Sequence, residues 1–308
     1  LIKNKNYIKA DEYLSSINKD DYTLLEELLS QVIFSWLQVE KFNLDYNQSQ
    51  EIFQLISPKY KNIKKINDVF LNCYFDTLSV ETKFLNLTND KNTDFSRYTF
   101  FYADYLYKKG LSKKANLILK KKLIDVPRNL LLNQFYSDIK NNNQNYLKNN
   151  FDCKDISNVI AELLYITANA LSTQTLYSLS NFYTNLAKFL NQNFFSYNTL
   201  LAENFIMIGD NKKAEKIYQL LKKFGSHYKW HSSKQIALLQ IEDSKTENAI
   251  NSLEKNYKNL KSPNSYQTFD LAQFLKNNQK FKESIYYYTQ VIENISKTHE
   301  LYPKAKDG

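Results

Sequence analysis

Apolar residues recur every three or four positions along most of the chain, which is the spacing of an amphipathic helix. In the stretch that follows Asp210, for example, Ala214, Tyr218 and Leu221 fall on one helical face. Only four Gly and four Pro interrupt the 308 residues, and the one Asp-Gly pair lies at the very end, at 307–308. An all-β chain of this length needs many more tight turns. The pattern therefore predicts an all-α chain of helices joined by short polar loops.

Small side chains recur within this pattern at fixed intervals. A first set is spaced 65, 34, 35 and 35 residues apart, where 65 is close to two intervals, and it comprises Ala103, Ala168, Ala202, Ala237 and Ala272. A second small residue follows twelve positions after each of these: Ala115, Ser180, Ala214, Ala249 and Ser284. In two units a Gly lies seven positions after the first small residue, at Gly110 and Gly209.

This spacing has a physical explanation. Two helices can cross closely only where the side chains between their backbones are small. A Gly in the intervening turn supplies the left-handed residue that ends the first helix. Helices this short are marginal alone, so each hairpin must bury its apolar face against its neighbours. Stacked hairpins of this kind form a solenoid.

Two units carry a resemblance to a known family. An order of small and aromatic residues is shared by two units. In the unit from Phe195 to Tyr228 it is Leu201-Ala202, Phe205, Gly209, Ala214 and Tyr218. In the unit 96–128 the corresponding residues are Ala103, Leu106, Gly110, Ala115 and Pro127. Both resemble the tetratricopeptide repeat, and the style of the array is similar to bacterial members of that family. The resemblance implies a right-handed α-solenoid of antiparallel helical hairpins. Asn198 and Ser233 depart from it, because a bulky residue is expected there.

The repeats are not equally clear along the chain. Residues 1–139 are expected to hold degenerate units, of which 96–128 is the best. The Asn-rich stretch 140–154 breaks the pattern and is expected to form a loop or hinge. Clear repeats resume over 155–300, and 301–308 is interpreted as a truncated tail without a polar closing helix. The array is expected to extend beyond both ends.

The resemblance also implies a binding surface, because the first helix of each tetratricopeptide hairpin lines a concave face where partners lie. By register, this face would include aromatic, amide and charged residues, a mixture typical of protein interfaces. They are Arg97, Phe100, Asp104, Tyr107, Tyr165, Asn169, Thr199, Glu203, Met207, His231, Lys234, Tyr266, Phe269 and Gln273. The Lys and Asn pairs with which chaperone-type members clamp a terminal carboxylate are not found at the matching positions, so such a clamp is not expected.

The net charge of +9 and the pI near 9.1 raise nucleic acid as a partner. However, Arg97 and Arg128 are the only arginines, and Arg is the residue best suited to phosphate and base edges. We therefore expect a solvated Lys-rich surface and regard nucleic acid as an unfavoured partner.

Cys73 and Cys153 lie far apart and belong to no CxxC motif. This predicts two free thiols, neither a disulfide framework nor a zinc site, and it fits a reducing compartment. The cytoplasm is favoured, but a periplasmic location stays open because the chain begins at Leu1 without Met. No stretch is long and apolar enough to span a membrane.

Motifs that could carry chemistry are incomplete. His227 and His231 have the spacing of two metal ligands, but Tyr228 stands where a metalloprotease has its Glu, and His227 is expected to precede the helix. The calcium-like stretch 90–94 is followed by Phe95 where a Gly is needed. The sequence therefore predicts no catalytic site, no metal and no cofactor.

The favoured function is a non-catalytic scaffold that binds a partner protein or peptide on the concave face. Three alternatives stay open. The first is a helical-repeat RNA-binding protein, because the related pentatricopeptide unit is of similar length. The second is the substrate-guiding part of a larger enzyme whose catalytic domain lies outside this chain. The third is a spacer in an envelope assembly.

Overall fold

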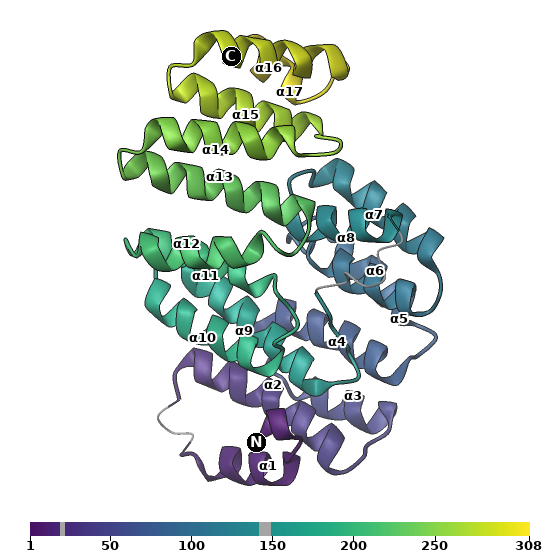
Figure 1. Cartoon of the computed structure of the whole chain (residues 1–308). Coiled ribbons are helices and arrows are strands. Elements are labelled where there is room, and N and C mark those ends of the chain that lie inside the picture. Colours follow the sequence, from purple (N-terminus) through teal and green to yellow (C-terminus); the bar gives the residue numbers. More distant parts are fainter. Residues whose placement is uncertain (19–21, 142–148) are drawn as a thin grey trace. The chain divides into compact units, whose positions relative to one another are not determined.

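Every regular element among residues 1–18, 22–141 and 149–308, which are the residues that the computed structural model describes, is a helix (Figure 1). The prediction of an all-α fold built from helical hairpins is thus confirmed. The chain divides into two units, Leu1–Ile208 (unit 1) and Gly209–Gly308 (unit 2), and each has its own internal packing.

Unit 1 runs from the 3-10 helix η1 through α11. Its helices are η1 (Ile2–Asn4), α1 (Tyr7–Ser16), α2 (Leu24–Lys41), α3 (Tyr46–Gln54), η2 (Pro58–Tyr60), α4 (Lys61–Phe75), α5 (Val80–Thr88), α6 (Tyr98–Lys108), α7 (Ser112–Asp125), α8 (Leu130–Lys140), α9 (Ile156–Thr173), α10 (Tyr177–Leu190) and α11 (Tyr197–Met207). From α1 to α8, each α-helix packs against the next one along the chain, and α9 to α11 do the same.

Unit 1 also contains contacts between hairpins that are distant in sequence. Helix α2 packs against α9, and η1 packs against α10. The Lys3 ammonium donates a hydrogen bond to the carbonyl of Leu190 at 3.0 Å. In a simple solenoid each repeat contacts only its neighbours. Unit 1 departs from that rule, because its first helices pack against its last complete hairpin.

Unit 2 contains α12 (Asn211–Leu221), α13 (Ser226–Glu242), α14 (Thr246–Lys258), α15 (Ser265–Asn277), α16 (Phe281–Asn294) and α17 (Leu301–Lys306). The hairpins α13–α14 and α15–α16 stack on each other (Figure 1). Residues 301–308 are expected to form only a tail, but most of them form α17. This helix packs against α15 and α16. It does so because Leu301 and Ala305, one turn apart, are both buried on its inner face.

All ten small residues of the repeat are buried, and none is more than 2% exposed. Two hairpins show why Ser can replace Ala at the second small position. The hydroxyl of Ser180 donates to the carbonyl of Ala168 at 2.7 Å, and that of Ser284 donates to the carbonyl of Ala272 at 2.8 Å. The two helices of each hairpin are therefore close enough for a side chain of one to bond the backbone of the other.

The turn inside the hairpins has one recurring conformation. The residue seven positions after the first small residue has a positive φ in every repeat: 78° at Gly110 and Gly209, and 61° to 63° at Thr175, Ser244 and Gln279. In four of these turns, the N–H of the next residue also bonds the carbonyl five positions earlier, as Leu111 does to Leu106 at 2.9 Å. This is the Schellman ending of a helix. The turn is thus kept even where its residue is not Gly.

The predicted hinge over 140–154 lies within unit 1. Of that stretch, 142–148 lie outside the described residues, so the expected loop stays a prediction there. The two units of the structure meet along the chain between Ile208 and Gly209.

Candidate functional site

One face of unit 2 joins residues from successive first helices. Lys234 of α13 forms an ion pair with Asp270 of α15, with 2.9 Å between Nζ and Oδ2. Tyr266, one turn before Asp270, donates from its hydroxyl to Oε1 of Glu300 at 2.9 Å. Gln273 extends the same stripe of α15 and is exposed. We call these five residues the unit 2 face.

Phe269, which the register placed on the binding surface, is instead in the core. Its side chain is 7% exposed and packs against Tyr288, with the ring centroids 5.5 Å apart. The physical reason is that Phe269 lies three positions before Ala272 and shares the buried stripe of α15. Tyr266 and Gln273 lie on the neighbouring stripe, where Tyr266 is half-buried at the edge of the core and Gln273 is exposed.

In unit 1, the predicted binding residues on α9 and α11 are not linked to one another by polar side-chain contacts like those of the unit 2 face. Asn169 and Glu203 are exposed, and Tyr165 is half-buried. Thr199 is half-buried, and its hydroxyl donates to the carbonyl of Ser196 at 2.7 Å within its own helix. Phe100 and Asp104, which the wider register also placed on this surface, are buried.

Arg97, also expected on the binding surface, forms a largely buried ion pair with Glu162. Its Nε and Nη2 donate to the two Glu162 oxygens at 2.6 and 2.9 Å. The guanidinium lies 4.0 Å from the ring centre of Tyr165, and Phe101, Phe194 and Tyr197 complete the surrounding aromatic group. Burial alone would lower the pKa of Arg97, but the Glu162 carboxylate outweighs burial and raises it far above its usual value.

Glu162 was missed in the sequence because it looked like a mere interruption of an apolar run. Its side chain is 0% exposed, and it also accepts a hydrogen bond from the Tyr197 hydroxyl at 3.4 Å. A rare Arg in a Lys-rich chain and a single acid in an apolar helix were signals that could have been paired. The pair connects the residue that precedes α6 to α9, so its role in unit 1 is structural.

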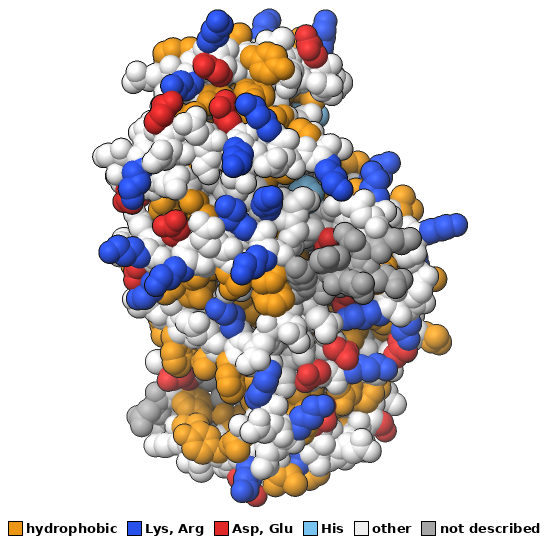
Figure 2. Space-filling view, viewed as in Figure 1, with side chains coloured by type: hydrophobic (Ala, Val, Ile, Leu, Met, Phe, Trp, Pro, Cys, Tyr) orange, Lys and Arg blue, Asp and Glu red, His pale blue; other side chains and the backbone are white. Residues whose placement is uncertain are grey.

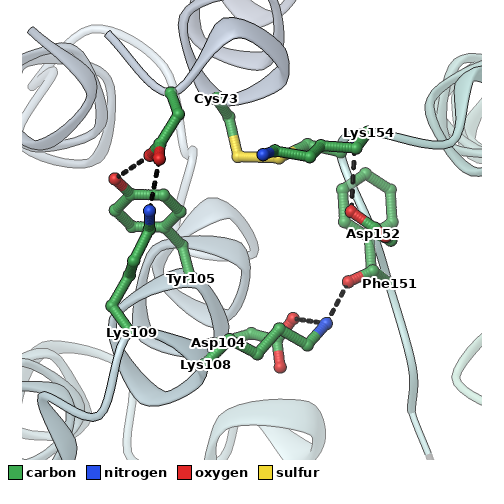
Figure 3. The surroundings of a disulfide bond; sticks show 10 residues. Cys73, Asp104, Tyr105, Lys108, Lys109, Phe151, Asp152 and Lys154 are labelled. Atoms are coloured by element: carbon green, nitrogen blue, oxygen red, sulfur yellow. Dashed lines mark hydrogen bonds and ion pairs between the residues drawn. A yellow bond between two sulfur atoms is a disulfide. The ribbon is translucent and has the colours of Figure 1, made fainter.

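Cys73 and Cys153 form a disulfide, so the prediction of two free thiols is wrong (Figure 3). Their Cα atoms lie 5.9 Å apart although 80 residues separate them. A large separation along the sequence does not keep two cysteines apart in the folded chain. The fold brings the segment before α9 back against α4, which no local motif records.

The disulfide lines a cavity of about 250 Å³ in unit 1 (Figure 3). Its walls carry opposite charges that are already paired: Asp104 binds Lys108 at 2.7 Å, and Asp76 binds Lys109 and accepts from the Tyr105 hydroxyl at 2.8 Å. Burial raises the pKa of Asp104 to about 6, although the neighbouring Lys108 opposes this shift.

Comparisons with known proteins do not give a family for this chain. No family model matches the chain, and no curated protein matches it. Among solved structures, the chain is similar to a tetratricopeptide repeat protein. That protein is from Parabacteroides merdae ATCC 43184; it is 12% identical, the match covers 79% of this chain and 98% of that one, and the TM-score is 0.37.

A human IFIT1 dimer with m7Gppp-AAAA is also similar, at 15% identity, with 94% of this chain and 68% of that one covered and a TM-score of 0.28. Because both TM-scores lie below 0.5, we infer nothing from either structure about what this chain binds.

His227 and His231 both lie within α13, so the expectation that His227 precedes the helix is wrong. Burial lowers the pKa of each imidazole to about 4. Over the described ranges, no group of three or more His, Cys, Asp or Glu residues is arranged to hold a metal ion. The absence of a catalytic site, metal and cofactor stays a prediction.

The basic surface is dispersed on the face that Figure 2 draws, where lysines are separated by uncharged and apolar side chains. This is unlike the clustered basic stripe that phosphate backbones select. In the part of the chain that the structure describes, no helix is long and apolar enough to cross a membrane.

Proposed function

We propose that the chain is a non-catalytic scaffold that binds a partner protein or peptide along the unit 2 face. The observation that supports this most is a pair of polar contacts that link α13, α15 and the start of α17. The Lys234–Asp270 pair joins α13 to α15, and the Tyr266–Glu300 hydrogen bond joins α15 to the residue that precedes α17. Such contacts hold the side chains in place before a partner arrives, which lowers the entropic cost of binding.

The chemistry of this face suits an extended peptide. The Gln273 side chain is exposed and can both donate to and accept from a peptide backbone. Tyr266 offers an aromatic ring with a polar tip, a combination enriched at interfaces. Lys234 is 25% exposed and Asp270 is 12% exposed, so both charges can still be reached from solvent.

The test is a site-specific photo-cross-link in cells that make the protein. A photoreactive amino acid replaces Gln273 on the unit 2 face, and in a matched variant it replaces Lys255, which is exposed on α14. The proposal expects one protein to be cross-linked from position 273 and absent from position 255. Equal capture from both positions would contradict this placement of the binding surface.

A matched pair of double variants then asks whether the side chains themselves matter. Lys234→Ala with Tyr266→Ala should reduce cross-linking from position 273 at least tenfold. Lys255→Ala with Tyr286→Ala removes the same residue types from exposed positions on second helices and should leave cross-linking unchanged. Helical circular dichroism must be equal in both, so that a loss of fold is not mistaken for a loss of binding.

RNA is the alternative outcome of the same experiment. If the material cross-linked from position 273 is removed by ribonuclease, and binding weakens steeply with salt, the partner is nucleic acid and the scaffold proposal fails.

A further inference from the structure

The segment Asn149–Lys154, which we call the strap, is held by hydrogen bonds to a distant part of unit 1. The side-chain carbonyl of Asn149 accepts from the N–H of Ser196 at 2.8 Å. The N–H of Asn150 donates to the carbonyl of Asn193 at 3.0 Å, and the carbonyl of Asn150 accepts from the Asn191 side chain at 3.0 Å. The start of the strap is therefore fixed to the connection between α10 and α11.

The middle of the strap enters the aromatic core. The ring of Phe151 is 4% exposed, and its centroid lies 4.4 Å from that of Phe101, 5.1 Å from Phe70 and 6.4 Å from Phe194. These three partners come from α6, from α4 and from the residues just before α11. Phe151 thus packs between elements that are far apart along the chain.

The end of the strap is covalently attached. Cys153 is bonded to Cys73 of α4, and the two residues are 9% and 4% exposed. These 308 residues contain no other cysteine that could compete for the pairing. A buried disulfide is poorly accessible to attack by thiolates, which is a feature of structural disulfides rather than of labile ones.

We propose that this chain matures in a thiol-oxidising compartment, where the Cys73–Cys153 disulfide forms and fastens the strap to α4. Disulfides persist in such compartments and are rare where glutathione and thioredoxin keep thiols reduced. This reverses the expectation of a reducing compartment that the cysteine spacing gave. It concerns unit 1 and does not depend on the function proposed for the unit 2 face.

The chemistry is a thiol–disulfide exchange with a donor disulfide as the oxidant. One cysteine thiolate attacks a donor sulfur, which forms a mixed disulfide and releases one donor thiolate. The second cysteine, as its thiolate, then attacks the sulfur of the first. The Cys73–Cys153 bond forms, the donor leaves as a dithiol, and the protein has lost two electrons and two protons.

The first test measures the redox state in the cells that make the protein. Cells are quenched in acid, the chain is denatured, and free thiols are labelled with a maleimide large enough to shift its mobility on a gel. The proposal expects no shift without reductant and a double shift after reduction. Labelling of both cysteines without reductant would overturn it.

The second test asks whether the bond holds unit 1 together. Hydrogen exchange is measured on the whole chain with and without a phosphine reductant. Closing an 80-residue loop should lower the unfolding equilibrium constant by about a thousandfold. The slowest amides of unit 1 should therefore exchange about a thousandfold faster after reduction, while those of unit 2, which has no cysteine, should not change.

A Cys73→Ala, Cys153→Ala double variant is the control for the reductant. Its unit 1 should exchange as fast as that of the reduced wild type, and reductant should have no further effect on it. If the reduced wild type keeps its slow exchange in unit 1, the disulfide does not fasten the strap, and that part of the proposal is wrong.

Discussion

The first helix of each hairpin ends in a left-handed turn. Because of this turn, the same substitution to Gly should change the free energy of unfolding in opposite directions at two nearby positions. Thr175 has a φ of +63° and a β-branched side chain, a combination that costs about 1–2 kcal/mol. Gly adopts this conformation freely, although it loses about 0.5–1 kcal/mol more backbone entropy on folding. Thr175→Gly is therefore expected to stabilise unit 1 by about 1 kcal/mol.

Thr173 provides the matched control. It is also an exposed threonine, but it is the last residue of α9, two positions earlier, where the backbone is helical. Thr173→Gly should destabilise by a few tenths of a kcal/mol, because Gly is the poorer helix former. The same chemical change should thus have opposite signs at the two positions.

Gly110 supplies the reverse experiment. A Cβ at Gly110 would meet no atom within 4 Å, so an alanine there is opposed only by its φ of +78°. Gly110→Ala should destabilise unit 1 by about 1 kcal/mol.

The assay is urea unfolding followed by tryptophan fluorescence. The chain has two tryptophans, and both are buried: Trp36 lies in unit 1 and Trp230 lies in unit 2. A Trp230→Phe background leaves Trp36 as the only reporter, so unit 1 is followed even if the two units unfold separately. If Thr175→Gly shifts the urea midpoint downward as Thr173→Gly does, the turn does not carry the strain described here.

Three further predictions concern burial and charge. Arg97→Met should destabilise unit 1 by about 3–5 kcal/mol, because it leaves the buried Glu162 carboxylate without its partner. Adding Glu162→Leu should restore most of the lost stability in the Trp36 assay. If it restores none, the loss does not come from an unpaired Glu162. Unit 2 should lose stability as the pH falls from about 6.5 to 4. Burial lowers the pKa of the His231 imidazole to about 4, so only the unfolded state takes up the proton between these pH values. His231 alone should account for a loss of up to about 3 kcal/mol. Urea midpoints at pH 7 and 4.5, reported by Trp230 in a Trp36→Phe background, should show this pH dependence. His231→Gln should reduce it by the share of His231 and leave that of His227, whose pKa is also about 4. An unchanged pH dependence in the variant would exclude His231 as a cause. Ala214→Leu should destabilise by about 1–3 kcal/mol, because Ala214 is 0% exposed, whereas Lys212→Ala, at an exposed position, should change the thermal midpoint little. Equal effects would show that the surroundings of Ala214 can accept a larger side chain.

The hairpins could be predicted from the sequence because close helix crossings tolerate few residue types. A larger side chain than that of Ala103 or Ala168 cannot fit between two backbones, so the small residues remain visible as a spacing. The first ninety residues lack this signal. There, helices α2 and α4 contribute large core residues such as Trp36 and Phe70, which many arrangements could bury.

The turn conformation was only partly visible. Gly110 and Gly209 indicated it, but Thr175, Ser244 and Gln279 adopt the same conformation without any preference of their own for it. In those hairpins the helix contacts impose the turn, and local propensity is overridden.

The candidate sites were predicted least well, because they depend on contacts across long sequence separations. Of the unit 2 face, the register predicted Lys234, Tyr266 and Gln273 but not their partners Asp270 and Glu300, and binding at this face stays a prediction. Phe269 was misplaced by one stripe. The pairing of Cys73 with Cys153 depends on how α4 and the strap meet in space, and no local spacing contains that information.

The hydrogen bonds from Ser180 to Ala168 and from Ser284 to Ala272 have a consequence for how such a chain can change its length. Both span twelve positions, and the same interval separates the small residues in every repeat. One residue inserted or deleted within a hairpin would move the second small residue out of the crossing. The interval between hairpins varies more: it is 34 or 35 residues in three cases, but 65 residues separate Ala103 from Ala168, where the additional helix α8 lies. Natural insertions should therefore accumulate between hairpins, and the chain should grow or shrink in evolution by whole hairpins.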